Sequence, residues 1–287
     1  MSNAAEGKKW SKKKKAIVIV LSVLLALIVL VVAVGVYALN TYCKTADYDV
    51  LQTNQDVTLI AHRGMRSVAP ENTAPAFEEA GKHGYWGAEC DIYRTKDGVW
   101  IVSHDSHTYR MMDKSAFVEK KTYDELMEQK VDNGVNVENY PDLSFCSLEN
   151  YLKICKNYGM VAVIELKGKN NTEHYDEIID LVQQYGVEAV YISFHFENLE
   201  KIRALTDAPV YFLTQEISDE DIELALSLDN CGIDFNGNKA ENFEKGMIKK
   251  CIEKGLEVGA WTIDDTGTLD KLVAEGVTLI TTDNITK

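Results

Sequence analysis

Three carboxylates in the sequence have the types and spacing of a site for a divalent cation. Glu89 and Asp91 lie two positions apart in an apolar run, so on a β-strand both side chains point to the same face. Glu165 lies near the end of another apolar run. Carboxylates at one site repel one another unless a cation or a proton lies between them, and hard oxygen ligands suit Ca²⁺, Mg²⁺ or Mn²⁺ better than Zn²⁺. We therefore predict a divalent metal on these residues, Ca²⁺ or Mg²⁺ with Mn²⁺ as third candidate; solvated rim charges are the alternative.

Two histidines and two cationic side chains also follow strand-like runs. His62 and His104 suit acid–base catalysis, in which one imidazole takes a proton while the other gives one. Metal ligation and ordinary polar contacts are the alternatives for this pair. Arg63 and Lys167 match the oxygens of a phosphoryl group, so we predict that they bind a phosphate. Trp261 either packs against the substrate or fills the top of the core. The whole set indicates metal-assisted chemistry on a phosphate ester.

The elements that must position these side chains alternate regularly. Eight apolar, strand-like runs are separated, for the most part, by helix-like segments. The runs are Val57–Ala61, Ala88–Tyr93, Met160–Leu166, Ala189–Phe194, Val210–Leu213, Cys231–Phe235, Val258–Ile263 and Thr278–Thr282. This α/β pattern predicts a closed parallel TIM (β/α)8 barrel with its active site at the carboxyl ends of the strands. An open doubly wound sheet is the alternative, but its G-x-G-x-x-G loop is absent after the first run.

The alternation is interrupted after the second run, over about residues 95–146. This segment holds an extra strand-like run, Val99–Ser103. It also holds Thr122 and Glu125 at the spacing of a helix capping box, in which each residue satisfies a backbone amide of the other. We interpret the segment as an insertion after strand 2 of the barrel.

The N-terminal part of the chain predicts a membrane anchor. Residues 16–39 carry no charge, and at about 1.5 Å per residue they span a hydrocarbon core about 30 Å thick. Six lysines precede this stretch and no comparable basic cluster follows it, which places the N-terminus in the cytoplasm. We predict a single-pass cell-membrane protein with a basic cytoplasmic tail (1–15), a transmembrane helix (16–39), a linker (40–56) and an extracytoplasmic barrel (57–287). A cleaved signal peptide, or a lipoprotein signal ending at Cys43, is the alternative.

Composition excludes several other classes of protein. The chain has 287 residues, 46% of them hydrophobic, which is enough for one large core or two small ones and excludes a disordered chain. Its net charge is −15 although lysines gather at the N-terminus, so the acidic remainder argues against a nucleic-acid partner.

The six cysteines include no C-x-x-C pair, and we expect most to be buried free thiols. The expected partners are a small-molecule or lipid-derived phosphodiester and the membrane; the oligomeric state is not readable.

Short motifs follow one another in a fixed order along the predicted barrel. In chain order they are His62-Arg63-Gly64, Pro70-Glu71-Asn72-Thr73, Glu89-Cys90-Asp91, Thr95-Lys96-Asp97-Gly98, His104-Asp105, Glu165-Leu166-Lys167, Ser193-Phe194 and Trp261-Thr262. Over about residues 57–287 this series resembles the glycerophosphodiester phosphodiesterase family, and the anchor suggests a membrane-anchored bacterial-type member. The motifs in the first part of the series are the most specific.

The resemblance implies a TIM barrel that hydrolyses glycerophosphodiesters to glycerol 3-phosphate and an alcohol. It assigns the metal to the three carboxylates, the acid–base work to the two histidines and the phosphate to the two cations named above. It leaves open whether water attacks directly or the glycerol 2-hydroxyl attacks first to give a cyclic phosphate. Two other readings stay open: a phospholipase D-like enzyme acting on lysophospholipids or wall glycerophosphate polymers, and a catalytically silent binding barrel.

Overall fold

The computed structural model describes residues 11–46 and 48–287 and divides the chain into two units, Met1–Lys44 and Thr45–Lys287. Most of the predicted basic tail, residues 1–10, lies outside the described residues.

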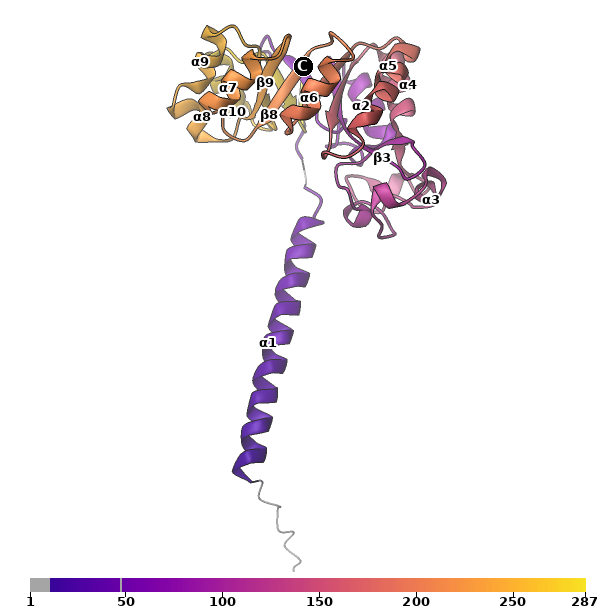
Figure 1. Cartoon of the computed structure of the whole chain (residues 1–287), viewed down its shortest axis with the longest axis vertical. Coiled ribbons are helices and arrows are strands. Elements are labelled where there is room, and N and C mark those ends of the chain that lie inside the picture. Colours follow the sequence, from indigo (N-terminus) through magenta and orange to yellow (C-terminus); the bar gives the residue numbers. More distant parts are fainter. Residues whose placement is uncertain (1–10, 47) are drawn as a thin grey trace, which may run out of the picture. The chain divides into compact units, whose positions relative to one another are not determined.

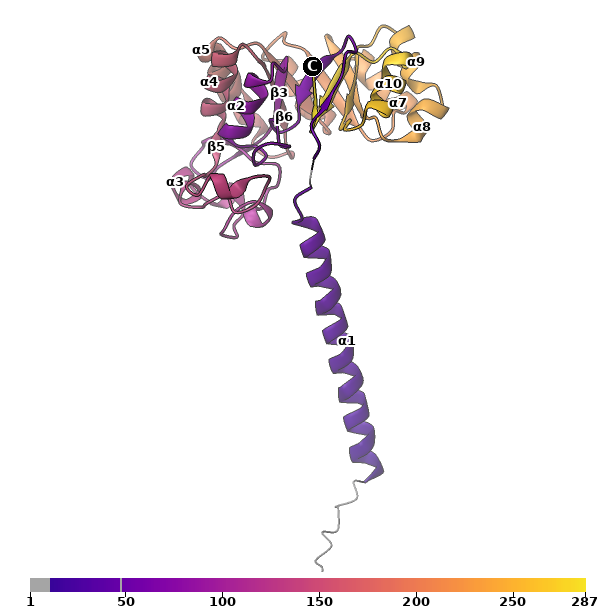
Figure 2. The ribbon, with the colours of Figure 1, turned by 180° about the vertical axis from the view of Figure 1, so that it is seen from behind.

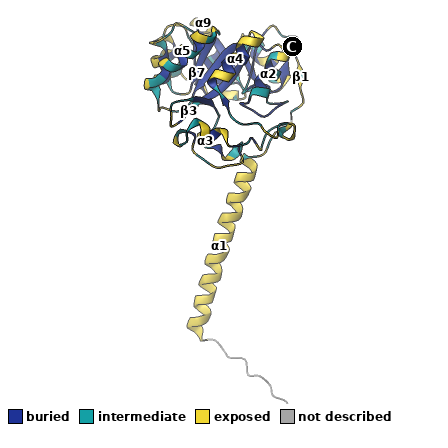
Figure 3. Cartoon of the chain, turned by 90° about the vertical axis from the view of Figure 1, so that its right-hand side faces the viewer, coloured by how far each residue is buried: buried dark blue, intermediate teal, exposed yellow. Residues whose placement is uncertain are grey.

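Helix α1 (Lys12–Tyr42) is the helix of the first unit. It begins after Ser11, whose side chain accepts a hydrogen bond from the amide of Lys14 (3.3 Å). It extends beyond the predicted span of 16–39 at both ends. The apolar stretch has a mean hydropathy of 3.6, and no residue of the helix is buried (Figure 3). The helix is therefore long and apolar enough to cross a membrane, a property that it shares with signal sequences.

The second unit is built around a closed ring of eight parallel strands. Figures 1 and 2 show this unit, with its strands and the helices beside them, from opposite sides. In the order in which they pair, which is also their order along the chain, the strands of the ring are β2 (Thr58–Ala61), β3 (Gly87–Arg94), β6 (Val161–Leu166), β7 (Ala189–Ser193), β8 (Val210–Thr214), β9 (Cys231–Asn236), β10 (Val258–Trp261) and β11 (Leu279–Thr282). Strand β2 pairs with both β11 and β3, which closes the ring. The predicted TIM barrel is confirmed, and the open sheet is excluded.

Amphipathic helices cover the outside of the ring. They are α2 (Ala74–Lys82), α4 (Leu148–Tyr158), α5 (Tyr175–Tyr185), α6 (Phe196–Arg203), α7 (Asp219–Leu226), α8 (Ala240–Glu244), α9 (Met247–Glu253) and α10 (Thr266–Glu275). Helix α4 shows the pattern: Leu148, Tyr151, Leu152 and Cys155 recur at helical spacing and are all fully buried, while the remaining face is mostly exposed. These apolar faces pack against the outward-facing strand residues and form most of the core.

A smaller apolar cluster fills the inside of the ring. Its buried members alternate along the strands with residues that face the helices. They are Ile60, Val161, Val163, Val190, Ile192, Tyr211 and Leu213. Further along the same strands the inward positions become polar, for example Glu165 after Val163 on β6. The apolar layer therefore forms a packed base beneath a polar mouth. All six cysteines are free, and four of them are buried.

The predicted insertion after β3 is present. Strand β3 extends past its pairing with β6 and pairs there with β4 (Trp100–Val102), which runs antiparallel to it; β5 (Cys146–Ser147) pairs with β4. Between them lie the short helix α3 (Tyr123–Met127) and three 3-10 turns, η1 (Thr108–Arg110), η2 (Val118–Lys120) and η3 (Val137–Asn139). Thr122 and Glu125 form the predicted capping box of α3.

The ends of the second unit are joined to one another. Strand β1 (Leu51–Gln52) lies within the segment predicted as a linker, and it pairs in parallel with β12 (Ile285–Thr286). The remaining short element is η4 (Thr172–His174), which precedes α5. Pairing of β1 with β12 brings the residues that precede the barrel next to the residues that follow its last strand.

Candidate active site

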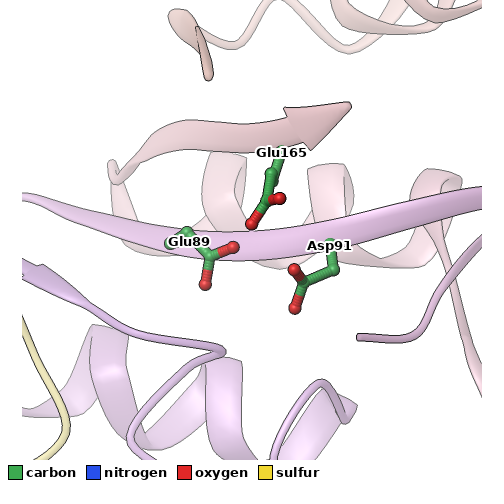
Figure 4. A group of neighbouring side chains, drawn as sticks. All are labelled: Glu89, Asp91 and Glu165. Carbon is green, nitrogen blue, oxygen red and sulfur yellow. The ribbon is translucent and has the colours of Figure 1, made fainter. Parts of the chain in front are cut away.

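Three buried carboxylates from β3 and β6 lie side by side (Figure 4). One oxygen from each of Glu89, Asp91 and Glu165 lies within 4.8 Å of the other two. Asp91 is opposite Glu165 in the register of the two strands, and alternation along β3 turns Glu89 to the same side. Their exposed fractions are 2%, 0% and 8%, respectively. The fold therefore brings together all three carboxylates that are predicted from the sequence to bind a metal, and it buries them.

The carboxylate cluster has the properties of a site for a hard divalent cation. Its ligands are all carboxylate oxygens, and Oε1 of Glu89 is buried without a hydrogen-bond partner. Burial and the neighbouring Asp91 raise the pKa of Glu89 well above its usual range and that of Glu165 to about 7. Burial acts in the same direction on Asp91, but Lys167 and Arg63 hold its pKa well below its usual range. Acids that suppress each other's ionisation in this way take up either protons or a cation.

Lys167 neutralises part of the negative charge. Its Nζ lies 2.9 Å from a carboxylate oxygen of Glu165 and 3.2 Å from one of Asp91. Although burial opposes it, the two acids raise the pKa of Lys167, so its side chain stays charged at neutral pH. The residue also lines the cavity described below, where a phosphate would meet its ammonium group.

A tight turn after β2 connects Arg63 to the carboxylate cluster. Arg63 has a backbone φ of 57°, and its amide donates a hydrogen bond to Oε2 of Glu89 (2.8 Å). Its guanidinium donates to Glu71 (2.8 Å) and lies 3.5 Å from Asp91. The backbone of Arg63 thus fixes a predicted metal ligand, while its side chain lines the cavity in the position predicted for a phosphate ligand.

Gly64, the next residue in this turn, cannot be enlarged without strain. Its φ is 77°, and a Cβ would lie 2.7 Å from the backbone carbonyl carbon of Ala76. We expect Gly64→Ala to lower the free energy of unfolding by about 2–5 kcal/mol, because left-handed backbone costs an L residue about 1–2 kcal/mol and the overlap adds about 1–3 kcal/mol. Gly84→Ala is the matched control, since Gly84 has a φ of 71° with nothing within 4 Å of a Cβ. Urea unfolding that finds the two variants equally destabilised would contradict the role of the contact.

His62, which follows the first strand of the barrel, is oriented by a carboxylate that follows the last strand. Its Nδ1 lies 2.7 Å from Oδ1 of Asp283, which follows β11. Burial, assisted by the charge of Arg63, lowers the pKa of His62. Burial opposes ionisation of Asp283 too, but His62 and Arg66 hold the pKa of that carboxyl below its usual value. An ionised Asp283 accepts the Nδ1 proton, so the lone pair of a neutral His62 lies on Nε2.

His104 reaches the same mouth from the insertion. Its Nδ1 lies 3.1 Å from Oδ1 of Asp105, whose Oδ2 accepts a hydrogen bond from Arg110 (2.7 Å). Arg110 also donates to Glu71 (2.5 Å), the same carboxylate that binds Arg63. Burial would raise the pKa of Glu71, but the surrounding arginines hold it below its usual range. These contacts therefore form a continuous chain from the second predicted histidine to the turn that carries the first.

A cavity of about 260 Å³ opens among these groups. Its polar lining includes predicted site residues, namely His62, Arg63, Glu89, His104, Glu165 and Lys167. Trp261 and Phe194 belong to its apolar lining, with ring centroids 5.5 Å apart in an edge-to-face arrangement. Trp261 is held there by a hydrogen bond from its indole nitrogen to the backbone oxygen of Asp234 (3.2 Å). Trp261 therefore lines the space in which a substrate would lie.

Asp234 and Asn72 are among the polar residues of the site that were not predicted as such. Asp234 on β9 lines the cavity with an exposed fraction of 4%, and its Oδ1 has no hydrogen-bond partner. Burial, with the charge of Glu165, raises the pKa of Asp234 to about 8. The sequence feature that could have identified Asp234 is a charged residue within an apolar strand. Asn72 lies in the motif Pro70-Glu71-Asn72-Thr73, but its contact with the site is evident only from the fold. Its side-chain amide donates a hydrogen bond to Asp91 (2.8 Å).

Comparisons with known proteins identify the family of this chain. The Glycerophosphoryl diester phosphodiesterase family matches residues 62–287. Protein YhdW of Bacillus subtilis is 31% identical over 239 residues, which cover 78% of this chain and 93% of YhdW. The glycerophosphodiester phosphodiesterase of Caldanaerobacter subterraneus is 26% identical over 235 residues, 79% of this chain and 93% of that enzyme.

A solved structure shows the same fold. The phosphodiesterase of Oleispira antarctica, in complex with its product sn-glycerol-3-phosphate, superposes with a TM-score of 0.72 at 24% identity, covering 79% of this chain and 93% of that one. The matched family region spans nearly the whole barrel, so the chain belongs to the glycerophosphoryl diester phosphodiesterase family.

Proposed function

We propose that this protein hydrolyses glycerophosphodiesters to glycerol 3-phosphate and an alcohol, with a divalent cation bound at the mouth of the barrel. The proposal rests on one observation above all: a single cavity is lined by acidic, imidazole and cationic side chains, which are the side-chain types that such a reaction needs. Membership of the family supports the reaction class. The complex of the Oleispira antarctica enzyme with sn-glycerol-3-phosphate supports the product class.

Glu89, Asp91 and Glu165 are the residues that would hold the cation, Ca²⁺ or Mg²⁺ with Mn²⁺ as third candidate. A cation bound there supplies electrostatic stabilisation to a phosphoryl oxygen and lowers the pKa of a nearby hydroxyl. Lys167, now paired with two of these acids, would then be released from neutralising them. Its ammonium group and the guanidinium of Arg63 would bind the phosphate oxygens.

The two histidines would move the protons. His62 is suited to accept one at Nε2, because Asp283 accepts its Nδ1–H and burial keeps the ring neutral near pH 7. It would take the proton of the attacking hydroxyl, either water or the 2-hydroxyl of the glycerol itself. His104, supported by Asp105, would donate a proton to the oxygen of the leaving alcohol as the P–O bond breaks. Trp261 would pack against the carbon skeleton of the glycerol.

We also propose that α1 anchors the protein in the cell membrane. Residues 1–15 would then be a cytoplasmic tail, residues 16–39 the membrane-spanning part and residues 57–287 an extracytoplasmic catalytic barrel. The length and hydropathy of α1 and the lysines that precede residue 16 support this arrangement. Digestion of intact cells with an impermeant protease tests the orientation, since only an external barrel is cleaved.

We expect the full chain, purified in detergent and treated with a chelator, to release glycerol 3-phosphate from glycerophosphocholine only when a divalent cation is restored. Adding back Ca²⁺, Mg²⁺ and Mn²⁺ separately ranks the metals. Phosphocholine and glycerol as products would contradict the proposed position of the cut. A cyclic phosphate formed only from lysophospholipids would favour the phospholipase D-like alternative, and no cleavage of any phosphodiester would favour the silent binding barrel.

A further inference from the structure

We propose that Tyr48, a residue of the segment between α1 and the barrel, positions the imidazole of His62 through Asp283. This inference rests on the proposed role of His62 as the proton acceptor. Tyr48 is a positioning residue in this scheme, because its hydroxyl contacts Asp283 and not the reacting atoms.

The two oxygens of Asp283 are bound by two different side chains. Oδ1 lies 2.7 Å from Nδ1 of His62, and Oδ2 accepts a hydrogen bond from the hydroxyl of Tyr48 (2.8 Å). The backbone amide of Asp283 donates to Asp264 (2.8 Å), which fixes the main chain below the carboxylate. A planar carboxylate held at both oxygens cannot rotate freely about its Cβ–Cγ bond. The direction of its bond to His62 is therefore set in part by Tyr48.

Tyr48 is itself held in place from two sides. The guanidinium of Arg66 lies 5.7 Å from the centre of its ring and 3.7 Å from Oδ2 of Asp283. Directly after Tyr48, the backbone oxygen of Asp49 accepts a hydrogen bond from the side chain of Asn284 (2.9 Å), and the amide of Leu51 donates to the backbone of Asn284 (2.9 Å). Pairing of β1 with β12 continues this attachment. Burial and the charge of Asp283 raise the pKa of Tyr48, so its hydroxyl keeps the proton that it donates.

The segment that carries Tyr48 lies outside the matched family region, which begins at residue 62. It also begins only a few residues after the end of α1 at Tyr42. The residues that connect the apolar helix to the barrel therefore do more than join two units, because one of them completes the hydrogen-bond chain of the proposed proton acceptor. Removal of the Tyr48 hydroxyl leaves Arg66 as the neighbour of Oδ2, and Asp283 can turn toward it.

The test compares Tyr48→Phe with Tyr158→Phe in the full chain in detergent. Tyr48→Phe removes the hydroxyl and keeps the ring beside Arg66, and Tyr158 is an exposed tyrosine of α4 that serves as the matched control. We expect Tyr48→Phe to lower kcat by about 3–10-fold with an unchanged KM, because the base is misdirected while the substrate-binding groups stay in place. The imidazole proton of His62 on Nδ1, observed by ¹H–¹⁵N NMR without substrate, should shift upfield or broaden. Tyr158→Phe should change neither.

The NMR signal separates failure of this inference from failure of the proposed function. An unchanged His62 signal in Tyr48→Phe overturns the inference, whatever the activity. A changed signal with an unchanged kcat overturns it as well, because the contact would then have no part in catalysis. If the wild-type protein releases no glycerol 3-phosphate, the proposed function fails, and the His62 signal alone decides whether Tyr48 positions the ring.

Discussion

Replacing His62 by alanine is expected to lower kcat by about 10²–10⁴-fold, the range that a general acid or base contributes. The variant should fold normally. Asp283 keeps Tyr48 and Arg66 as partners when the imidazole is removed, so no buried carboxylate is left unpaired. Because burial and Arg63 lower the pKa of His62, the acidic limb of the wild-type pH–rate profile should lie below the usual value of 6.5. The variant should lose that limb.

Initial rates of glycerol 3-phosphate release at saturating cation measure this effect, and circular dichroism melting checks the fold. His83→Ala is the matched control, since His83 is a half-exposed histidine at the end of α2 that contacts Glu79 and lies outside the cavity. Added imidazole should restore part of the activity of His62→Ala by entering the space left by the ring. A variant whose kcat stays within about threefold of wild type would exclude His62 as the proton acceptor.

The second large effect is the stabilisation of the folded protein by a cation bound at the carboxylate cluster. A cation at about 100 times its Kd is expected to raise the free energy of unfolding by about 2.7 kcal/mol and the Tm by about 5–10 °C. Glu89→Gln should abolish most of this shift and the activity with it, because it removes one of three ionised ligands while keeping the volume of the side chain. Thermal melts of the full chain in detergent, with and without each metal, measure both quantities. Glu188→Gln, on the exposed surface, is the control.

Without a cation, the stability of the protein should change with pH in a direction that the carboxyl pKa values determine. The pKa values of Glu89 and Glu165 are raised above 4.5 in the folded protein, that of Glu165 to about 7. A raised carboxyl pKa contributes stability below pH 4.5 that is lost as the pH rises through the folded value. Without cation, Glu89→Gln should therefore match the wild type near pH 5 and be the more stable of the two at pH 8. Equal metal-induced shifts in wild type and Glu89→Gln would show that the cation binds elsewhere.

The barrel and the proposed reacting groups could be predicted from the sequence because both depend on local patterns. Each strand appears as an apolar run of its own, and eight such runs separated by helical segments specify a closed ring. Most of the proposed reacting side chains lie in or directly after these runs: His62 follows β2, and Glu165 is the last residue but one of β6. His104 follows β4 of the insertion instead. In a parallel barrel the carboxyl ends of all strands meet at one mouth, so local position along the chain also specifies position in space.

The residues that orient those groups and shift their pKa values reach them through tertiary contacts, which a local sequence pattern does not specify. Asp283 orients His62 across 221 positions of the chain, and Tyr48 reaches Asp283 across 235. Asp234 belongs to the site only because β9 turns it inward between apolar neighbours. A hydrogen bond requires a donor–acceptor distance within a window of about 0.5 Å, whereas the periodicity of a sequence specifies only which face of a strand a residue occupies. The kinds of reacting groups can therefore be inferred from the sequence, but their orientation and charge state depend on closure of the barrel and on the pairing of β1 with β12.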